Sequence, residues 1–233
     1  MTTTKNYVVI GGSTGIGRAL ALQLSENHNV FATYNSTPTS DTANLSYVPF
    51  DVTDETASLD WLPDQIDGLA YCVGAIQLKP FHRVKLDDFL DDYKKQTGGA
   101  IRVLQAALPA LKTPGNSSVV LFSTVAVQTG FPFHSIVSSS KGAIEGLTRA
   151  LSAEWAPKIR VNAIAPSITQ TPMANALLNT PEKIEANAQR HPLKKVGSAE
   201  ELAKFASFLL SEDASWITGQ IHHVDGGISS LKV

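Results

Sequence analysis

Short apolar runs rich in β-branched residues alternate along the chain with segments of helical spacing. The run 119–122 (Val-Val-Leu-Phe) is apolar at every position, as in a strand that is covered on both faces. Such alternation predicts βα units that wind a parallel sheet. The predicted strands are 7–11, 29–34, 46–50, 68–73, 117–123, 159–164 and 220–224. The predicted helices are 15–26, 54–62, 86–111, 136–155, 173–190 and 199–211.

Two connections depart from this alternation of strands and helices. The segment 35–45 is short and rich in Ser, Thr and Pro, so we expect a reduced coil there instead of a crossover helix. The connection 166–198 contains four prolines and interrupts the alternation, which favours a mobile lid over a linker between domains. The prediction is therefore a single α/β domain over residues 1–233, with a Rossmann-like, doubly wound parallel sheet of about seven strands flanked by helices.

Composition narrows the classes of function. With 43% hydrophobic residues and a net charge of −2, the chain is expected to fold around one core, and it has no basic stripe for nucleic acid or an anionic membrane. The uncharged stretch 113–140 is interrupted by polar residues throughout, so it is not expected to span a membrane. Cys72 is the only cysteine, which excludes an intrachain disulfide and a zinc site built from several cysteines. Residues 1–5 leave no room for the apolar core of a signal peptide, so we expect a cytoplasmic protein.

A glycine-rich turn follows the first predicted strand and opens the first predicted helix. Gly11, Gly15 and Gly17 permit a tight turn, a close approach of backbone to a diphosphate, and close packing of helix on strand. The amino end of the helix offers unpaired N–H donors to an anion. A plain tight turn is the alternative, but the order of strand, turn and helix is the context that dinucleotide binding requires.

With these glycines, the chain resembles the short-chain dehydrogenases/reductases over essentially its whole length. Asp51-Val52 is similar to the family's adenine-contacting pair, and the segment 160–166 is similar to the strand that ends beneath the nicotinamide, with Ser167 in place of the usual glycine. Thr171 and the segments 217–220 and 224–227 also match. The resemblance implies cofactor contacts from Gly11, Ser13, Thr14, Gly15, Ile16, Gly17, Tyr34, Asn35, Ser36, Asp51, Val52, Val73, Gly74, Lys141, Pro166, Ser167, Thr169 and Thr171.

The catalytic positions depart from the family pattern. Lys141 matches the family's lysine, but the tyrosine four residues earlier is replaced by Val137. Thr124 stands where the family has a serine and keeps a hydroxyl, and Gln96 replaces an asparagine. Reduction of a carbonyl needs a proton at oxygen, which the tyrosine normally provides and valine cannot.

Two neighbouring side chains are candidates for the missing acid. His134 lies seven positions before Lys141, the spacing at which the related enoyl reductases have their tyrosine, and an imidazole can donate a proton near neutral pH. Ser138 is the weaker candidate, because a hydroxyl is a poor acid unless it relays a proton.

Each of these residues also has a plainer interpretation. His134 could be a hydrogen-bonded spacer, Lys141 could only bind the nicotinamide ribose, and Thr124 could be a β-former. Gln96 could be structural, and the apolar residues of the lid, Met173 among them, could face the substrate or pack within the lid. The charged residues of the helix 86–111 are expected on a solvated face; they are Asp87, Asp88, Asp91, Asp92, Lys94 and Lys95.

The region after the second strand bears on the choice of dinucleotide. A carboxylate there would accept a hydrogen bond from the ribose 2′-hydroxyl of NAD, but no acid lies between Glu26 and Asp41. NADP(H) is therefore favoured, although the run also lacks Arg and Lys, and NAD(H) stays possible.

Three functions from different classes follow. The preferred one is an NADP(H)-dependent oxidoreductase acting on an unidentified carbonyl, alcohol or enone. The alternatives are a non-catalytic NADP(H)-binding sensor or regulatory protein, and a structural partner without cofactor affinity. The expected partners are a small-molecule substrate and, from the resemblance alone, further copies of the chain in a dimer or tetramer. No metal site is predicted.

Overall fold

The sheet at the centre of the molecule is parallel throughout. The computed structural model describes residues 4–232. Residues 1–3 and Val233 lie outside the described residues, and the expectation that no signal peptide is present rests partly on residues 1–3. The seven strands of the sheet follow the order β3-β2-β1-β4-β5-β6-β9. Their bounds are β1 (Asn6–Ile10), β2 (Asn29–Tyr34), β3 (Leu45–Pro49), β4 (Gly68–Tyr71), β5 (Ser117–Phe122), β6 (Ile159–Pro166) and β9 (Ile221–Val224).

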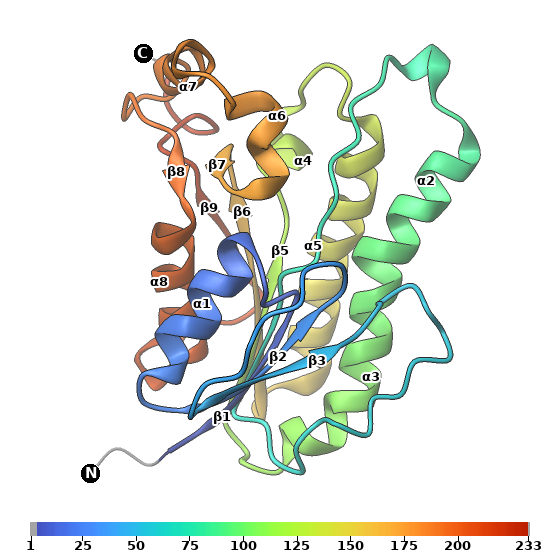
Figure 1. Ribbon diagram of the computed structural model, residues 1–233, viewed down its shortest axis with the longest axis vertical. Coiled ribbons are helices and arrows are strands. Elements are labelled where there is room, and N and C mark those ends of the chain that lie inside the picture. The colour runs from blue at the N-terminus through green and yellow to red at the C-terminus, as the bar shows by residue number, and fades with distance from the viewer. Residues whose placement is uncertain (1–3, 233) are drawn as a thin grey trace.

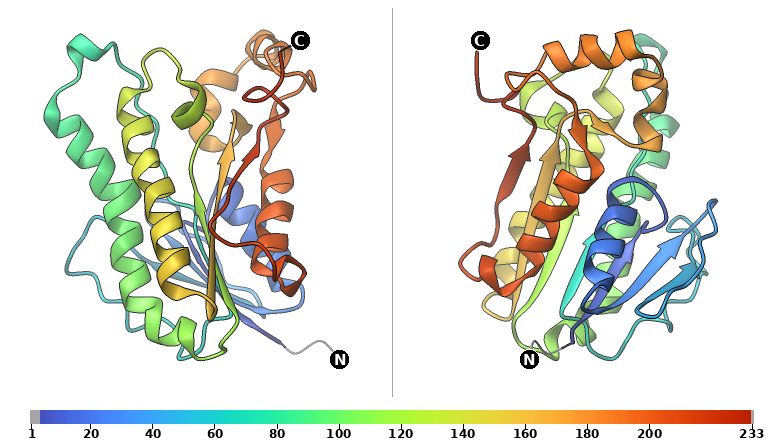
Figure 2. Two further views of the ribbon diagram at one scale, coloured as in Figure 1. Left: turned by 180° about the vertical axis from the view of Figure 1, so that it is seen from behind. Right: turned by 60° about the vertical axis from the view of Figure 1, so that its left-hand side comes forward.

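Helices cover both faces of this sheet, as Figures 1 and 2 show from several sides. One face packs on α1 (Gly15–Ser25) and α8 (Ala199–Leu210), and the other on α3 (Gly99–Lys112) and α5 (Ser135–Trp155). Successive side chains of a strand point to opposite faces, so Val9 joins the first core and Val8 the second. The predicted single α/β domain with a doubly wound parallel sheet is confirmed, and each predicted strand agrees with the structure to within two residues.

The predicted helix 54–62 is wrong, because this segment is a series of turns. The carboxylate of Asp54 accepts hydrogen bonds from the N–H and the hydroxyl of Thr56, at 2.9 and 2.7 Å. The guanidinium of Arg102 in α3 donates to the backbone carbonyls of Asp54 and Ala57. These bonds occupy backbone groups that a helix would need, so the turns are preferred.

The predicted helix 86–111 is divided by a π-helical turn, Lys94–Gly98, which separates α2 (Leu86–Tyr93) from α3. The hydroxyl of Tyr71 at the end of β4 donates to the carbonyl of Lys95 within that turn, at 2.6 Å. The wider turn is thereby fixed against the sheet.

The segment 166–198 lies over the carboxyl ends of the strands (Figure 1). The predicted helix 173–190 is interrupted there: a 3₁₀ turn and α6 (Asn175–Leu178) precede α7 (Pro181–Gln189). Pro181 begins α7, and the Thr180 hydroxyl caps it by accepting from the N–H of Lys183 at 3.3 Å. The short strands β7 (Thr169–Gln170) and β8 (Gly197–Ser198) pair in parallel and hold the two ends of the segment together.

The segment 35–44 contains no helix, as predicted, and the bridge between Thr42 and Leu45 leads into β3. A four-residue helix, α4 (Ala126–Thr129), follows β5. Across residues 4–232, no helix combines the length and the apolar character that crossing a membrane would take.

Candidate active site

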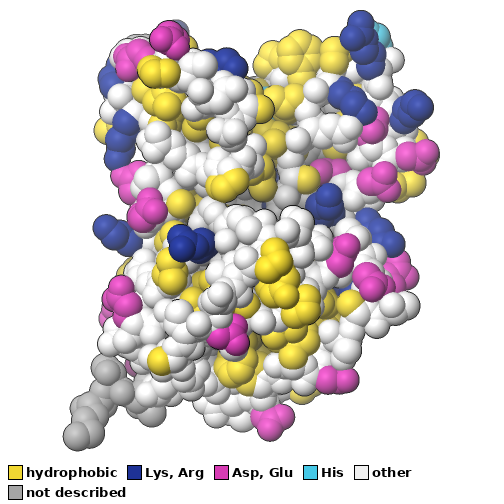
Figure 3. All heavy atoms as spheres, in the orientation of Figure 1, with side chains coloured by type: hydrophobic (Ala, Val, Ile, Leu, Met, Phe, Trp, Pro, Cys, Tyr) yellow, Lys and Arg dark blue, Asp and Glu magenta, His cyan; other side chains and the backbone are white. Residues whose placement is uncertain are grey.

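One cavity of about 580 Å³ opens at the carboxyl ends of the strands. Figure 3 shows that the surface is hollowed between the segment that contains α6 and the end of the sheet. Because parallel strands all end at this edge, residues far apart in the chain meet there. The predicted site residues that line the cavity are Gly11, Ser13, Thr14, Gly15, Ile16, Gly17, Asn35, Ser36, Val73, Gly74, Gln96, Thr124, His134, Lys141, Pro166, Ser167, Thr169 and Thr171. The others lie outside its lining; they are Tyr34, Asp51, Val52 and Ser138.

The glycine turn has the geometry of an anion cradle. Gly11 and Gly15 have φ of +79° and +52°, in the left-handed region that favours glycine. A Cβ on Gly17 would lie 2.2 Å from the carbonyl oxygen of Gly11, so only glycine fits. The side chain of Thr14 forms no capping hydrogen bond, which leaves the first-turn N–H groups of α1 for a ligand. These residues therefore fit a dinucleotide diphosphate.

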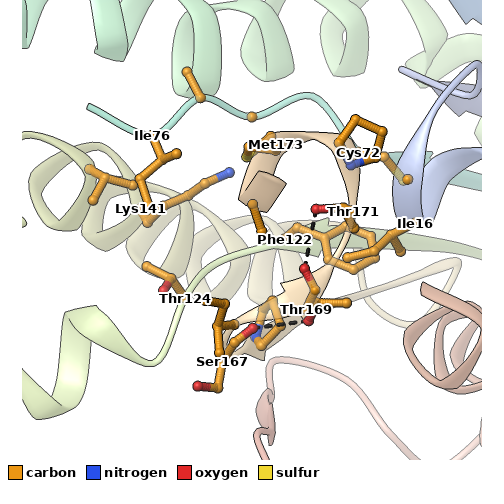
Figure 4. A pocket seen from close by; sticks show the side chains of 18 of the residues that line it. Ile16, Cys72, Ile76, Phe122, Thr124, Lys141, Ser167, Thr169, Thr171 and Met173 are labelled. Carbon is orange, nitrogen blue, oxygen red and sulfur yellow. Dashed lines mark hydrogen bonds between the residues drawn. The ribbon is translucent and has the colours of Figure 1, made fainter. Parts of the chain in front are cut away.

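Lys141 is the central cation of the cavity. Its side chain extends from α5 into the space that Thr124, Ser167 and Met173 surround (Figure 4). The residue is only 6% exposed. Burial lowers the pKa of Lys141 to about 8, although the nearby Asp92 and Cys72 act to raise it. The ammonium can thus bind ribose hydroxyls or take part in proton chemistry close to neutral pH.

Gln96 and Asp92 form a buried pair behind Lys141. The amide nitrogen of Gln96 donates to a carboxylate oxygen of Asp92 at 2.7 Å and to the carbonyl of Ala75 at 3.3 Å. The amide oxygen Oε1 of Gln96 is buried without a partner among the described residues. Asp92 is 6% exposed, so its expected place on a solvated helix face is wrong. The interval of four residues from Asp92 to Gln96 was the signal that could have found this pair.

The side chains considered as proton donors differ in their placement. Val137 is buried and borders the cavity one helical turn before Lys141. His134 lines the cavity, and its Nδ1 lies 2.8 Å from the carbonyl oxygen of Pro132. Thr124 also lines it, with its hydroxyl accepting from the N–H of Ala126 at 3.3 Å. Ser138 donates its hydroxyl to the carbonyl of Ala126, at 3.2 Å.

A serine–histidine contact at the cavity was not predicted as a pair. The hydroxyl of Ser167, after β6, lies 2.8 Å from Nε2 of His191, and Nδ1 of His191 lies 2.8 Å from the carbonyl oxygen of Asn187. His191 is 2% exposed and lines the cavity. Nothing in the spacing of residues indicated this contact, because it joins a strand end to the loop after α7.

The part of the cavity beyond Lys141 is mainly apolar. Side chains from several elements line it: Ile76, Leu78, Phe131, Val137, Met173 and Leu177. The guanidinium of Arg190 lies 5.6 Å from the centre of the Phe131 ring, which connects the segment 166–198 to the loop before α5.

Comparisons with known proteins agree with this geometry. A family profile described as enoyl-(acyl carrier protein) reductase matches residues 11–229. A tropinone reductase homologue of Arabidopsis thaliana is 37% identical over 158 residues, which make up 67% of this chain and 60% of that protein. A tropinone reductase homologue of Datura stramonium is 43% identical over 127 residues, 53% of this chain and 47% of that protein. The chain thus spans about half to three-fifths of the length of these relatives.

Solved structures show the same fold. The ligand-free aldohexose dehydrogenase of Thermoplasma acidophilum has a TM-score of 0.86 and 26% identity, covering 99% of this chain and 97% of that one. The structure of ElxO with NADP bound has a TM-score of 0.84 and 25% identity, covering 98% and 100%. Together with the glycine turn and Lys141, these matches establish that the chain belongs to the short-chain dehydrogenase/reductase family.

Proposed function

We propose that this protein is an NADP(H)-dependent oxidoreductase that acts on a carbonyl, alcohol or enone group of a small, largely apolar molecule. The main support is that one cavity joins the glycine cradle at Gly11–Gly17, the buried ammonium of Lys141 and the apolar chamber beyond it. A bound nicotinamide cofactor would supply or accept the hydride at that junction. The chain's own residues would bind the cofactor, orient the substrate and donate the proton to its oxygen.

The cofactor contacts in this proposal follow the lining of the cavity. The first-turn N–H groups of α1 would bind the diphosphate, and Lys141 the nicotinamide ribose. Asn35 and Ser36 line the cavity where the adenosine ribose would lie, and neither repels a 2′-phosphate. The next acid, Asp41, is engaged, because its carboxylate accepts from the N–H of Tyr47 at 2.7 Å. These features support a preference for NADP(H), the cofactor bound in the ElxO structure.

In the substrate chamber, Thr124 would orient the reacting oxygen, and His134 or a water would donate the proton. The tautomer of His134 limits how it can act. The carbonyl of Pro132 can only accept, so Nδ1 of His134 holds a proton and donates it to that carbonyl. A proton for the substrate would therefore come from Nε2 of the imidazolium form.

The first test is a titration of the purified protein with NADPH and with NADH, followed by cofactor fluorescence. We expect NADPH to bind more tightly than NADH, and Lys141→Met to weaken NADPH binding at least tenfold. An exposed lysine, Lys204, provides the matched control, Lys204→Met, with unchanged affinity. Failure of both cofactors to bind at millimolar concentration would overturn the proposal.

The second test is hydride transfer, measured as loss of NADPH absorbance with a panel of carbonyl compounds, enones and quinones. Turnover of an apolar member of the panel is the expected result. Tight NADPH binding without any turnover would instead favour the non-catalytic sensor, because Val137 leaves the family's proton-donor position without a hydroxyl.

A further inference from the structure

Three buried polar residues, Asp92, Gln96 and Lys141, lie at or next to the cavity wall, and the proposed binding of the cofactor gives a role to Lys141 alone. Asp92 and Lys141 are each 6% exposed, and Gln96 is fully buried. Asp92 belongs to α2, Gln96 to the π-helical turn and Lys141 to α5. The hydroxyl of Thr97 donates to the carbonyl of Ser140 at 3.0 Å, which fixes the π-helical turn against α5.

The amide of Gln96 has only one orientation that satisfies its neighbours. Its Nε2 faces two groups that can only accept, the carboxylate of Asp92 and the carbonyl of Ala75. Exchange of the amide nitrogen and oxygen would place Oε1 against both acceptors. Oε1 therefore turns to the other side, where it lies 3.7 Å from the position that a Cβ on Gly74 would occupy. Gly74 and Gln96 both line the cavity.

Buried charges are costly unless an opposite charge or hydrogen bonds compensate them. The Asp92 carboxylate receives one hydrogen bond, from Gln96, and its negative charge acts to raise the pKa of Lys141. The Asp92 charge thus offsets part of the cost of burying the ammonium of Lys141.

We propose that Asp92 is a positioning residue of the active site, which keeps Lys141 in its charged form and holds Gln96 with Oε1 toward the ligand. The inference rests on the proposed function, because it assumes that the cavity binds a nicotinamide cofactor through Lys141. It adds to that function a buried carboxylate that contacts neither substrate nor cofactor and acts through its two neighbours.

Other titratable groups near Lys141 do not replace Asp92. Burial raises the pKa of the Cys72 thiol to about 12, so it is neutral below that pH. Glu145 in α5 accepts a hydrogen bond from the hydroxyl of Ser123 at 2.7 Å and lies 3.7 Å from the guanidinium of Arg149. The remaining titratable groups that line the cavity are cations or histidines: Lys95, His134, Arg190 and His191.

The test compares Asp92→Asn with Asp91→Asn by NADPH titration between pH 6 and pH 10. Asparagine retains an oxygen that accepts from Gln96, so Asp92→Asn removes the charge and little else, whereas Asp91 is exposed. In the wild-type protein, NADPH affinity should fall as Lys141 loses its proton. In Asp92→Asn, that fall should begin about one pH unit lower, with affinity about fivefold weaker at pH 8, about tenfold weaker at pH 9 and nearly unchanged at pH 6. Asp91→Asn should follow the wild-type curve.

The charge-retaining variant Asp92→Glu should restore part of the wild-type pH profile. Coincident curves for the wild type and Asp92→Asn would overturn the inference and leave the proposed function intact. Absence of NADPH binding by the wild-type protein would instead defeat the proposed function.

A second measurement applies even if Asp92→Asn does not fold. If the two charges compensate each other, the double variant Asp92→Asn/Lys141→Met should melt at a higher temperature than the sum of the two single losses predicts. Such non-additive melting temperatures would support the inference. So would a double variant that folds although Asp92→Asn alone does not. Strictly additive losses would contradict it.

Discussion

The hydroxyl of Ser167 and the Nε2 of His191 lie 2.8 Å apart, and this contact joins the end of β6 to the loop after α7. Nδ1 of His191 faces the carbonyl oxygen of Asn187, which can only accept. In the neutral imidazole the proton is therefore on Nδ1, and Ser167 donates to Nε2. Ser167, where the family has a glycine, thus connects the carboxyl end of β6 to the loop after α7.

Removal of that hydroxyl should loosen this connection. Ser167→Ala leaves the buried Nε2 of His191 without a donor, which costs about 1–3 kcal/mol in unfolding free energy. We expect the melting temperature to fall by about 2–12 °C and NADPH affinity to weaken severalfold. Ser215→Ala, at an exposed serine, is the control. Equal melting temperatures for Ser167→Ala and the wild type would show that the contact contributes little.

The imidazole of His134 should matter for turnover. His134→Ala should slow hydride transfer at least tenfold while NADPH affinity stays the same, because a general acid typically contributes about 10²- to 10⁴-fold. Steady-state rates on the best substrate of the panel provide the measurement. The exposed His82 supplies the control, His82→Ala. Unchanged rates in His134→Ala would remove this residue from the mechanism and leave a water as the donor.

Restoration of the missing phenol is a test of the remaining geometry. Val137 borders the cavity, so the ring of Val137→Tyr can extend into it, one turn before Lys141. We expect faster carbonyl reduction, by up to about 10²-fold. Val137→Phe adds the ring without the hydroxyl and should stay slow. If both variants have the same rate, steric effects and not proton donation explain the change.

The buried ammonium should make stability depend on pH above neutrality. The pKa of Lys141 is lowered from 10.5 to about 8 in the folded protein, first by burial. Between these two values the unfolded chain binds more protons than the folded chain, so the free energy of unfolding rises with pH. Relative to Lys141→Met, the wild type should gain roughly 3 kcal/mol across that window. Urea unfolding at a series of pH values checks this, and parallel curves would contradict it.

Self-association is expected through the exposed apolar row of α2. Leu86 and Leu90 are 72% and 55% exposed, one helical turn apart, and Tyr93 continues the row. The double variant Leu86→Ser/Leu90→Ser should shift the protein from a dimer or tetramer to a monomer, as measured by light scattering after size-exclusion chromatography. Leu193→Ser alters an equally exposed leucine elsewhere and should keep the assembly. A monomeric wild-type protein would remove the basis for this expectation.

The fold could be predicted because its determinants are local in the sequence. Apolar runs such as 119–122 identify buried strands, and the order of strand, glycine turn and helix at Gly11–Gly17 fixes the first βα unit. The predicted helix 54–62 failed because Asp54 and the distant Arg102 occupy its backbone groups. Periodicity does not detect such side-chain hydrogen bonds.

The site could be predicted only in part, for a similar reason. Lys141, Thr124 and His134 follow from the resemblance to the family pattern within one stretch of chain, and the structure brings all three to the same cavity. Ser167, the partner of His191, comes from another part of the chain. A charged residue on a helix is expected to be exposed to solvent unless the element that packs against it is known. The burial of Asp92 could therefore not be predicted without the tertiary structure.

The π-helical turn Lys94–Gly98 limits which changes in chain length are tolerated between α2 and α3. A turn of this kind holds one residue more than a regular helix would, and such insertions are frequent at functional sites. Deletion of one residue within the turn would close it to a regular helical turn and change the placement of residues 94–98. Gln96 would then leave Asp92, and the Tyr71 hydroxyl would lose the Lys95 carbonyl. Descendants of this protein should therefore accept substitutions between α2 and α3 far more readily than deletions.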